Sequence, residues 1–200
     1  KVAKELGLTH FWQLDDDYID FRYAFNSKLK YITKNITMYR LDDVLPLLIE
    51  FLDTTPTKCI AFSQGGDFIG GDGSMVAKNT MKGAMTRKIM NSFLFKTDEP
   101  IEFVGRMNDD VNTYVTLGSR GDLLFTLGQL RLEQEQTQKN KGGLTEMYLE
   151  MGTYKKSFYT VMMQPSSVII KEMGVTNKRL HHTVKTKYTY PMIMSQKHKK

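Results

Sequence analysis

The sequence predicts a mixed α/β fold in which a central sheet is flanked by helices. Short apolar segments rich in β-favouring residues alternate with segments whose apolar residues recur at helical spacing. Some strand-like runs also follow one another at hairpin distance, so we expect both parallel and antiparallel neighbours in the sheet. The chain of 200 residues is long enough to bury a hydrophobic core.

The expected elements follow from local composition. A helix end at residues 1–6 is closed by Gly7, and further helices are expected at 42–52, from a cap at Asn108 to Leu117, and at 144–163. Pro46 is expected in the first turn of its helix, Gly118 at a helix end and Gly152 at a break. Strands are expected at 9–14, 58–62, 87–95, 101–104, 122–127, 130–134 and 167–171, with an edge strand within 181–190. Residues 21–37 and the glycine-rich 65–74 are expected to be irregular.

Charge is unevenly distributed along the chain. The net charge is +6, but residues 171–200 hold eight Lys and Arg and one acid, so the other 170 residues sum to −1. A basic end with interleaved aromatic residues suits a polyanionic partner such as DNA, and a solvated tail is the alternative.

Composition also narrows the cellular setting. The single cysteine, Cys59, excludes an internal disulfide framework, fits a reducing compartment, and is expected to be a small buried hydrophobe. No apolar run is long enough to span a bilayer, and the charged start is unlike a signal peptide. We therefore expect a cytoplasmic protein with no membrane association. The opening without methionine leads us to expect a missing preceding segment.

The run Asp15-Asp16-Asp17 directly follows a predicted strand. Three adjacent like charges repel, so a cation or hydrogen-bond donors are needed to hold them. On an extended segment Asp15 and Asp17 point to the same side, where they can bind a hard divalent ion, Mn²⁺ or Mg²⁺. We expect this run to hold the metal and a sugar-nucleotide diphosphate; a solvated acidic turn is the alternative.

A second acidic group lies at a predicted helix start, after Gly105 and Arg106. Asp109 or Asp110 is a candidate general base that deprotonates an acceptor hydroxyl, and Arg106 is a candidate phosphate ligand. The alternative is that both carboxylates only stabilise the helix N-terminus.

Two further groups are candidates for ligand binding. In the first, His182 is a candidate third metal ligand, with Lys185 and Lys187 supporting phosphates; surface positions are the alternative. The second is the glycine-rich loop, whose backbone N–H groups can approach an anion, a sugar or a base. Its candidate substrate-binding residues are Gln64, Gly65, Gly66 and Asp67. This loop matches neither the P-loop nor the dinucleotide-binding pattern.

These motifs, in this order, resemble a known family. The helix end followed by Phe-Trp-Gln-Leu-Asp-Asp-Asp resembles the centre of glycosyltransferases of the GT-A fold, where a strand ends in an Asp-x-Asp motif. Gly-Arg-Met-Asn-Asp-Asp resembles their acceptor-side motif, and the late histidine is also similar. More narrowly, segments 11–17, 63–71 and 105–114 resemble the TET/JBP-associated glycosyltransferases of phages and kinetoplastids, which are associated with adding sugar to hydroxymethylated pyrimidines in DNA.

The resemblance implies a GT-A-like single catalytic domain at 1–190, lacking the first part of its nucleotide-binding half, and a basic tail at 191–200. It implies a UDP-sugar donor, Mn²⁺ or Mg²⁺, hydroxymethylated DNA as acceptor, and the host cytoplasm if the source is a phage. Asp15 then lies near the donor ribose, Asp17 and His182 bind the metal, and Asp109 or Asp110 is the base. Alternatives are a protein or glycan acceptor, a two-metal nuclease or phosphotransferase, and a non-catalytic nucleic-acid-binding module.

Overall fold

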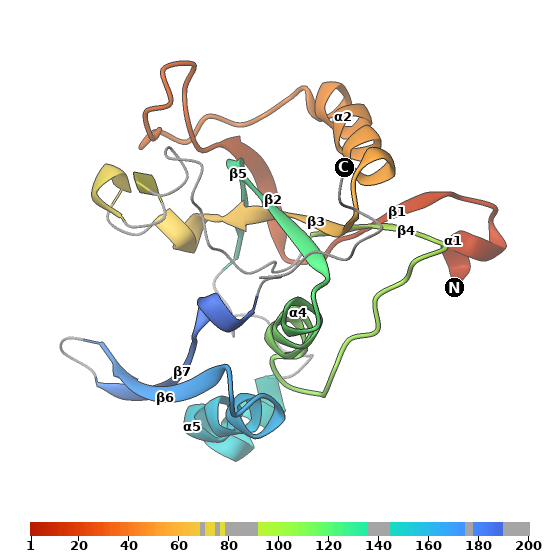
Figure 1. The fold of residues 1–200 in the computed structure, drawn as a ribbon. Helices are drawn as coiled ribbons and strands as arrows, with labels where there is room; N and C mark the ends of the chain where they lie inside the picture. The colour runs from red at the N-terminus through yellow and green to blue at the C-terminus, as the bar shows by residue number, and fades with distance from the viewer. Residues whose placement is uncertain (69–70, 75–76, 79–91, 136–144, 175–177, 190–200) are drawn as a thin grey trace. The chain divides into compact units, whose positions relative to one another are not determined.

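The computed structural model describes residues 1–68, 71–74, 77–78, 92–135, 145–174 and 178–189 (Figure 1). The chain forms two compact units, which we describe separately. Unit 1 comprises Lys1–Ile101 and Leu123–Glu135, and unit 2 comprises Glu102–Asp122 and Gln136–Lys200. The mixed α/β class is confirmed. The assignment of 1–190 to one domain stays a prediction, and the tail at 191–200 and residues 87–91 of an expected strand lie outside the described residues.

Unit 1 is built on a five-stranded mixed sheet in the order β1-β4-β3-β5-β2. Strands β3 and β5 are parallel, and the other neighbouring pairs are antiparallel, so β1, β3 and β5 run in one direction. The carboxyl ends of these three strands therefore meet at one edge of the sheet. The strands are β1 His10–Gln13, β2 Tyr18–Tyr23, β3 Thr57–Gln64, β4 Phe93–Lys96 and β5 Leu123–Gln134.

Three strand predictions are corrected by the structure. The two runs at 122–134 form one continuous strand, β5. Strand β2 lies partly in the segment expected to be irregular, although Phe21 and Tyr23 alternate there with Asp20 and Arg22 at the spacing of a strand. Residues 101–104 form no strand, because the backbone of Val104 is bonded to side chains of the following helix instead of to a neighbouring strand.

The sheet curls, because a short segment joins its two edge strands. Five Cα steps lead from Gln13 to Tyr18, and a fully extended chain of that length reaches at most about 18 Å. Four strand spacings of a flat sheet amount to about 19 Å, and residues 16–17 form a turn that shortens the reach further. The ring centroids of Trp12 on β1 and Phe21 on β2 lie 5.2 Å apart, and each ring also packs on Phe62 of β3. These three rings fill the inside of the curl.

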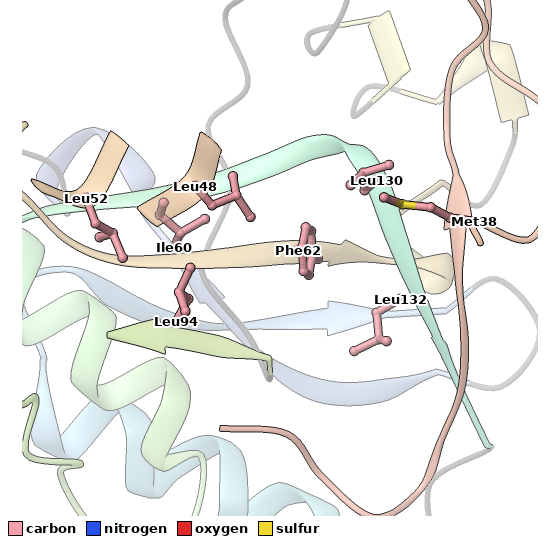
Figure 2. Packing of buried hydrophobic residues seen from close by; sticks show 8 residues of the cluster. All are labelled: Met38, Leu48, Leu52, Ile60, Phe62, Leu94, Leu130 and Leu132. Carbon is pink, nitrogen blue, oxygen red and sulfur yellow. The ribbon is translucent and has the colours of Figure 1, made fainter. Parts of the chain in front are cut away.

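One face of the sheet is covered by helix α2, Leu41–Thr54. Leu48 and Leu52 of this helix pack with Ile60, Phe62 and neighbouring residues in one buried cluster, shown in Figure 2. The predicted helix is confirmed, but Pro46 is its sixth residue and not part of the first turn. Since proline has no N–H, the carbonyl of Asp42 receives no helical hydrogen bond. On the opposite face Cys59 is fully buried, as predicted, and burial raises the pKa of its thiol.

The rest of unit 1 consists of short elements. Helix α1, Val2–Glu5, ends before Gly7, whose φ of 71° confirms the expected left-handed residue after the helix. The glycine-rich segment after β3 forms two 3₁₀ turns, η1 Gly65–Phe68 and η2 Gly71–Gly73, rather than a loop without regular structure. Residues 69–70 between them lie outside the described residues.

Unit 2 contains two helices and a two-stranded antiparallel ribbon. The helices are α4 Asp109–Ser119 and α5 Thr145–Met163, and Gly152 breaks α5 with φ 74°, as predicted. The strands are β6 Val168–Met173 and β7 Arg179–Val184, followed by the 3₁₀ turn η3, Thr186–Tyr188. Helix α5 packs against both strands of the ribbon. No helix within the described ranges is long and apolar enough to cross a bilayer.

Both predicted ends of α4 need correction. Asn108 is the residue before the helix, but it is left-handed (φ 51°) and its side chain makes no capping hydrogen bond. Its amide instead donates to the carbonyl of Lys156 at 3.2 Å and to the hydroxyl of Thr160 at 2.7 Å, which joins α4 to α5. Gly118 is the penultimate residue of the helix and not the residue after it. A side chain at this position would meet the backbone carbonyl of Thr189, which explains the glycine.

The close approach at Gly118 generates a stability prediction. Alanine has the higher helix propensity by about 1 kcal/mol, but a Cβ at this position collides with rigid backbone. We expect Gly118→Ala to lower the free energy of unfolding by about 1–3 kcal/mol, measured by urea denaturation. Ser119→Ala, in the last position of the same helix, is the control and should change it by less. A Gly118→Ala protein as stable as the wild type contradicts the packing described here.

Candidate active site

The candidate site of unit 1 lies where β1, β3 and β5 end. The acidic run follows the end of β1, the glycine turn η1 follows the end of β3, and Gln134 is the last residue of β5. Because β2 pairs with β5 and β5 pairs with β3, the acidic run, which leads into β2, lies near the carboxyl ends of these two strands. The sequence placed the acidic run and the glycine-rich segment each after a strand, and the structure brings them to the same edge.

Hydrogen bonds connect these two segments through Gln134. Its side chain accepts a bond from Nε2 of Gln64 at 3.0 Å, and its own Nε2 donates to Oδ2 of Asp17 at 3.5 Å. The backbone N–H of Glu135 also donates to the carbonyl of Asp17, at 3.0 Å. On the other side, the backbone N–H of Gln64 donates to Oδ2 of Asp67 at 3.0 Å, which shapes the turn. Asp17 and Gln64, which belong to two different predicted motifs, are thus joined by Gln134, which belongs to neither motif.

Asp17 is the residue of the acidic run whose carboxylate has a buried oxygen that accepts no hydrogen bond from the described residues. Its side chain is half-buried. Among the described residues, Oδ1 is fully buried with no hydrogen-bond partner, and the bond that Oδ2 accepts is long. A buried carboxylate oxygen without a partner is costly unless a donor or a cation reaches it. The site therefore fits a hard cation bound at Asp17.

Asp15 and Asp16 are placed differently from Asp17. Both are exposed, and residues 16–17 form a turn, so the expectation of an extended segment with Asp15 and Asp17 on one side is wrong. The reason is that the chain must turn within these few residues to enter β2.

Tyr18 directly follows the acidic run. Burial raises the pKa of its phenol to about 12, and the negative charges of Asp15 and Asp17 nearby raise it further. The Tyr18 phenol therefore stays protonated at neutral pH. Its oxygen accepts a hydrogen bond from the backbone N–H of Ser92 at 2.9 Å.

A group of four charged side chains on β2 and β5 lies next to the site. Arg22 is directly opposite Arg131 in the register, and Asp20 is opposite Glu133, so like charges face each other across the strands. The repulsion is offset along each strand, because Arg131 pairs with Glu133 at 3.0 Å and Arg22 pairs with Asp20 at 2.8 Å. The four charges sum to zero.

The buried Arg131 makes the most contacts in this group. Its guanidinium is 4% exposed, donates to the hydroxyl of Tyr31 at 2.5 Å and to Oδ1 of Asn35 at 3.0 Å, and lies over the Tyr31 ring. The backbone N–H of Tyr31 in turn donates to Asp72 in η2. These contacts attach the segment after β2 and the second glycine turn to the end of β5.

The same charged group explains why position 65 is glycine. A Cβ on Gly65 would lie 2.6 Å from both carboxylate oxygens of Glu133. That carboxylate is held by Arg131 and, at 3.7 Å, by Arg22, so it cannot move away freely. Gly66 differs, because a Cβ there meets no atom within 4 Å. The close approach of the turn to β5 therefore depends on Gly65 alone of the two.

We expect Gly65→Ala to be destabilising and Gly66→Ala to serve as its matched control. The added methyl group at position 65 displaces the Glu133 carboxylate and weakens its pairing with a buried arginine, at a cost of about 1–3 kcal/mol. The methyl group at position 66 enters open space and should change stability by less than about 1 kcal/mol. Chemical denaturation of the two variants measures the difference; equal stabilities would contradict the assignment.

In unit 2, the predicted catalytic carboxylates lie in the first turn of α4. Asp109 and Asp110 are half-buried, and Arg106 is exposed in the preceding turn. A residue of the helix holds this turn in place. The side-chain amide of the fully buried Asn112 donates hydrogen bonds to the carbonyls of Val104 and Met107, at 3.2 and 3.0 Å. The two carboxylates therefore lie at a helix N-terminus that these hydrogen bonds hold in place.

The late candidates lie on and after strand β7. His182 is buried (7% exposed) and its ring stacks on that of His181, with centroids 4.3 Å apart, so it is not the surface histidine of the alternative interpretation. Lys185 and Lys187 are exposed, as their proposed role requires. Lys187 lies over the ring of Tyr188 and, as the main cause, lowers the pKa of that phenol.

Within the residues that the structure describes, no three His, Cys, Asp or Glu side chains form a group that could hold a metal ion. An ion at Asp17 therefore has to take its remaining ligands from water, from the donor or from elsewhere in the chain. The shared ligation by Asp17 and His182 stays a prediction.

Sequence reasoning missed Gln134 and its neighbours on β5. A signal was present: Arg131 and Glu133 alternate with the apolar Leu130 and Leu132 in a predicted strand, which places two charges together on one face. Asn112 and Thr160 were also missed, and nothing local marks them, since they are defined by contacts between α4 and its surroundings.

Comparison with known proteins identifies the family of the chain. Residues 1–143 match the family profile described as TET-Associated Glycosyltransferase (TAGT). The match covers more than half of the chain, which therefore belongs to this glycosyltransferase family. It includes all the candidate residues from Asp15 to Asp110, whereas His182, Lys185 and Lys187 lie beyond it. Neither the curated proteins nor the solved structures contain a match to the chain.

Proposed function

We propose that this protein transfers a sugar from a UDP-sugar to the hydroxymethyl group of a modified pyrimidine in DNA, in a reaction that depends on Mn²⁺ or Mg²⁺. Membership in the TET-associated glycosyltransferases supports the reaction class. The single structural observation that carries the proposal is Asp17, whose half-buried carboxylate has a partnerless oxygen at the carboxyl edge of the sheet. This edge is where open α/β sheets bind ligands.

Charge balance favours Asp17 over its neighbours as the cation ligand. The four charges of Asp20, Arg22, Arg131 and Glu133 compensate one another, so they have no need of an external ion. Asp17 has only the long hydrogen bond from a neutral amide on its side chain. A divalent cation there would supply the positive charge that stabilises a departing diphosphate.

The other residues have roles suited to a single displacement with inversion. Asp109 or Asp110 accepts the proton of the hydroxymethyl group, whose oxygen bonds to the anomeric carbon as the bond from that carbon to the diphosphate breaks. Asp15 and Asp16, together with Arg106, Lys185 and Lys187, contact the donor. His182 is the proposed additional metal ligand, and residues 64–67 contact the sugar or the acceptor base. The base has to leave the DNA stack to reach such a site.

The test is transfer to DNA by the full-length protein. Duplexes containing hydroxymethylcytosine or hydroxymethyluracil are incubated with Mn²⁺ and a panel of UDP-sugars, and the nucleosides are analysed by mass spectrometry. The proposal expects a hexose mass increase on one modified base and none without metal. Transfer to a protein or glycan with none to DNA would establish the alternative acceptor; no transfer to anything by folded protein counts against the reaction.

We expect Asp17→Asn to abolish transfer while leaving the fold intact. An amide lacks the negative charge that binds a cation, but removal of a partly buried charge costs no stability. Wild-type protein should melt at a higher temperature with Mn²⁺ and UDP together, and Asp17→Asn should show no such increase. Asp42→Asn, at an exposed position in α2, is the matched control and should behave as the wild type. An Asp17→Asn enzyme that retains metal-dependent activity refutes this assignment.

The pair Asp109→Asn and Asp110→Asn identifies the base. Each variant loses a favourable charge at the helix N-terminus, so both should be destabilised similarly, by about 0.3–1 kcal/mol. Only the base is needed for proton transfer, and its replacement should lower kcat by about 10²–10⁴-fold. The other variant is then the control. If both retain wild-type kcat, the base lies elsewhere.

A further inference from the structure

The basic charge of the protein is concentrated in unit 2. This unit holds 14 Lys and Arg against 7 Asp and Glu, a net charge of +7. Unit 1 holds the other 14 Lys and Arg against 15 Asp and Glu, a net charge of −1. The division of charge thus follows the division of the structure. A positively charged unit attached to a nearly neutral one is suited to attract a polyanion.

The register of the β6–β7 ribbon determines which side chains share a face. Residues directly opposite each other lie on the same side, and side chains alternate along each strand. One face, which we call the inner face, is defined by Val168, Ile170 and Glu172 with their partners Val184, His182 and Leu180. The outer face is defined by Ile169, Lys171 and Met173 with their partners Thr183, His181 and Arg179.

The inner face is occupied by the protein itself. Val168 is fully buried and His182 is 7% exposed, and α5 packs against this ribbon. The acid of this face, Glu172, is paired with Lys178 at 2.9 Å. The inner face therefore serves to attach the ribbon and has its charge compensated.

The outer face carries basic side chains and no acid. Lys171 and Arg179 are exposed there, and His181 lies opposite Lys171. The backbone N–H of Lys185 donates to the carbonyl of Ser167 at 2.7 Å, which continues the ladder and brings Lys185 to the same side. Neither Lys171 nor Arg179 forms an ion pair with an acid of the described ranges. The cations of the outer face, Lys171 on β6 with Arg179 and Lys185 on and after β7, thus come from both strands and lie on one side of the ribbon.

We propose that the outer face of the β6–β7 ribbon binds the phosphate backbone of the acceptor duplex. The identity of the acceptor as DNA rests on the proposed function; the location of the surface rests on the ribbon's charge and register. A two-stranded ribbon is narrow enough to follow the major groove, which is about 12 Å wide. Lysine and arginine side chains then contact phosphates on its borders without reading the sequence. Residues 144–200 lie outside the family match, so this surface is a property of this chain's own C-terminal part.

The test uses a double variant, Lys171→Gln with Arg179→Gln, in the full-length protein. Lys185 is left unchanged because the proposed function assigns it to the donor. Lys4→Gln with Lys28→Gln is the matched control: both lysines are exposed in unit 1, and the net charge changes by the same amount. Binding to an unmodified duplex is followed by fluorescence anisotropy between 50 and 200 mM salt, and melting curves establish that both variants are folded.

The outer-face variant should bind DNA on the order of tenfold more weakly at low salt. The slope of log affinity against log salt should become less steep by about 1.8, because two phosphate contacts at about 0.9 each are lost. The control should keep the wild-type slope. Unchanged affinity and slope in the outer-face variant, or an equal loss in the control, overturns the proposal. So does a loss of binding to phosphatidylserine vesicles without a loss of binding to DNA.

A second readout separates this proposal from the proposed function. Transfer to free hydroxymethylated deoxynucleoside needs no backbone contact, so the outer-face variant should keep its wild-type rate there and lose activity on duplex DNA. If the wild-type protein transfers sugar to neither substrate, the proposed function has failed, while the anisotropy result still decides whether the ribbon binds DNA. If transfer to the duplex is unaffected, the ribbon is not the acceptor surface.

Discussion

The closure of the unit 1 sheet around Trp12, Phe21 and Phe62 is the contact on which the candidate site depends. Strands β1 and β2 lie at opposite ends of the strand order, yet only residues 14–17 connect them. Packing of the three rings keeps the two edges close enough for that connection. The acidic run thereby leads from β1 directly into β2 at the opposite edge of the sheet. Pairing of β2 with β5 places Tyr18 opposite Gln134, and Gln134 reaches the preceding residue, Asp17.

Two kinds of charge meet at this edge, and their different compensation assigns them different roles. Asp20, Arg22, Arg131 and Glu133 are paired among themselves, and their contacts with Tyr31, Asn35 and the Gly65 turn hold neighbouring segments in place. Asp17 has no such partner for its buried oxygen. Paired charges stabilise a structure only when the geometry of their contacts is good, whereas a buried charge without a partner is costly until a ligand or cation binds to it. The site therefore combines charges that pair with one another and a carboxylate oxygen, Oδ1 of Asp17, that has no hydrogen-bond partner among the described residues.

Unit 2 shows the same separation of roles on a different element. The ribbon's inner face is buried at Val168 and His182 and its acid is paired, whereas Lys171 and Arg179 on the outer face form no ion pair with an acid of the described residues. Helix α4 presents the two candidate base residues from a helix start that is fixed by Asn108 and Asn112. The positions proposed to bind a partner are thus held in place by neighbouring side chains for which no such role is proposed.

The sequence by itself determined the α/β class, helix α2, the break at Gly152 and the family, because these depend on local periodicity, on glycine conformation and on contiguous motifs. Tertiary structure alone decided that Asp17, Gln64 and Gln134 meet, since they come from the turn before β2 and from the ends of β3 and β5, and no single segment determines the order of these strands. It also decided that Gly118 lies inside α4 and that residues 101–104 form no strand. The approach of the Thr189 carbonyl requires a glycine at position 118, and bonds from Val104 to side chains of the following helix take the place of strand pairing.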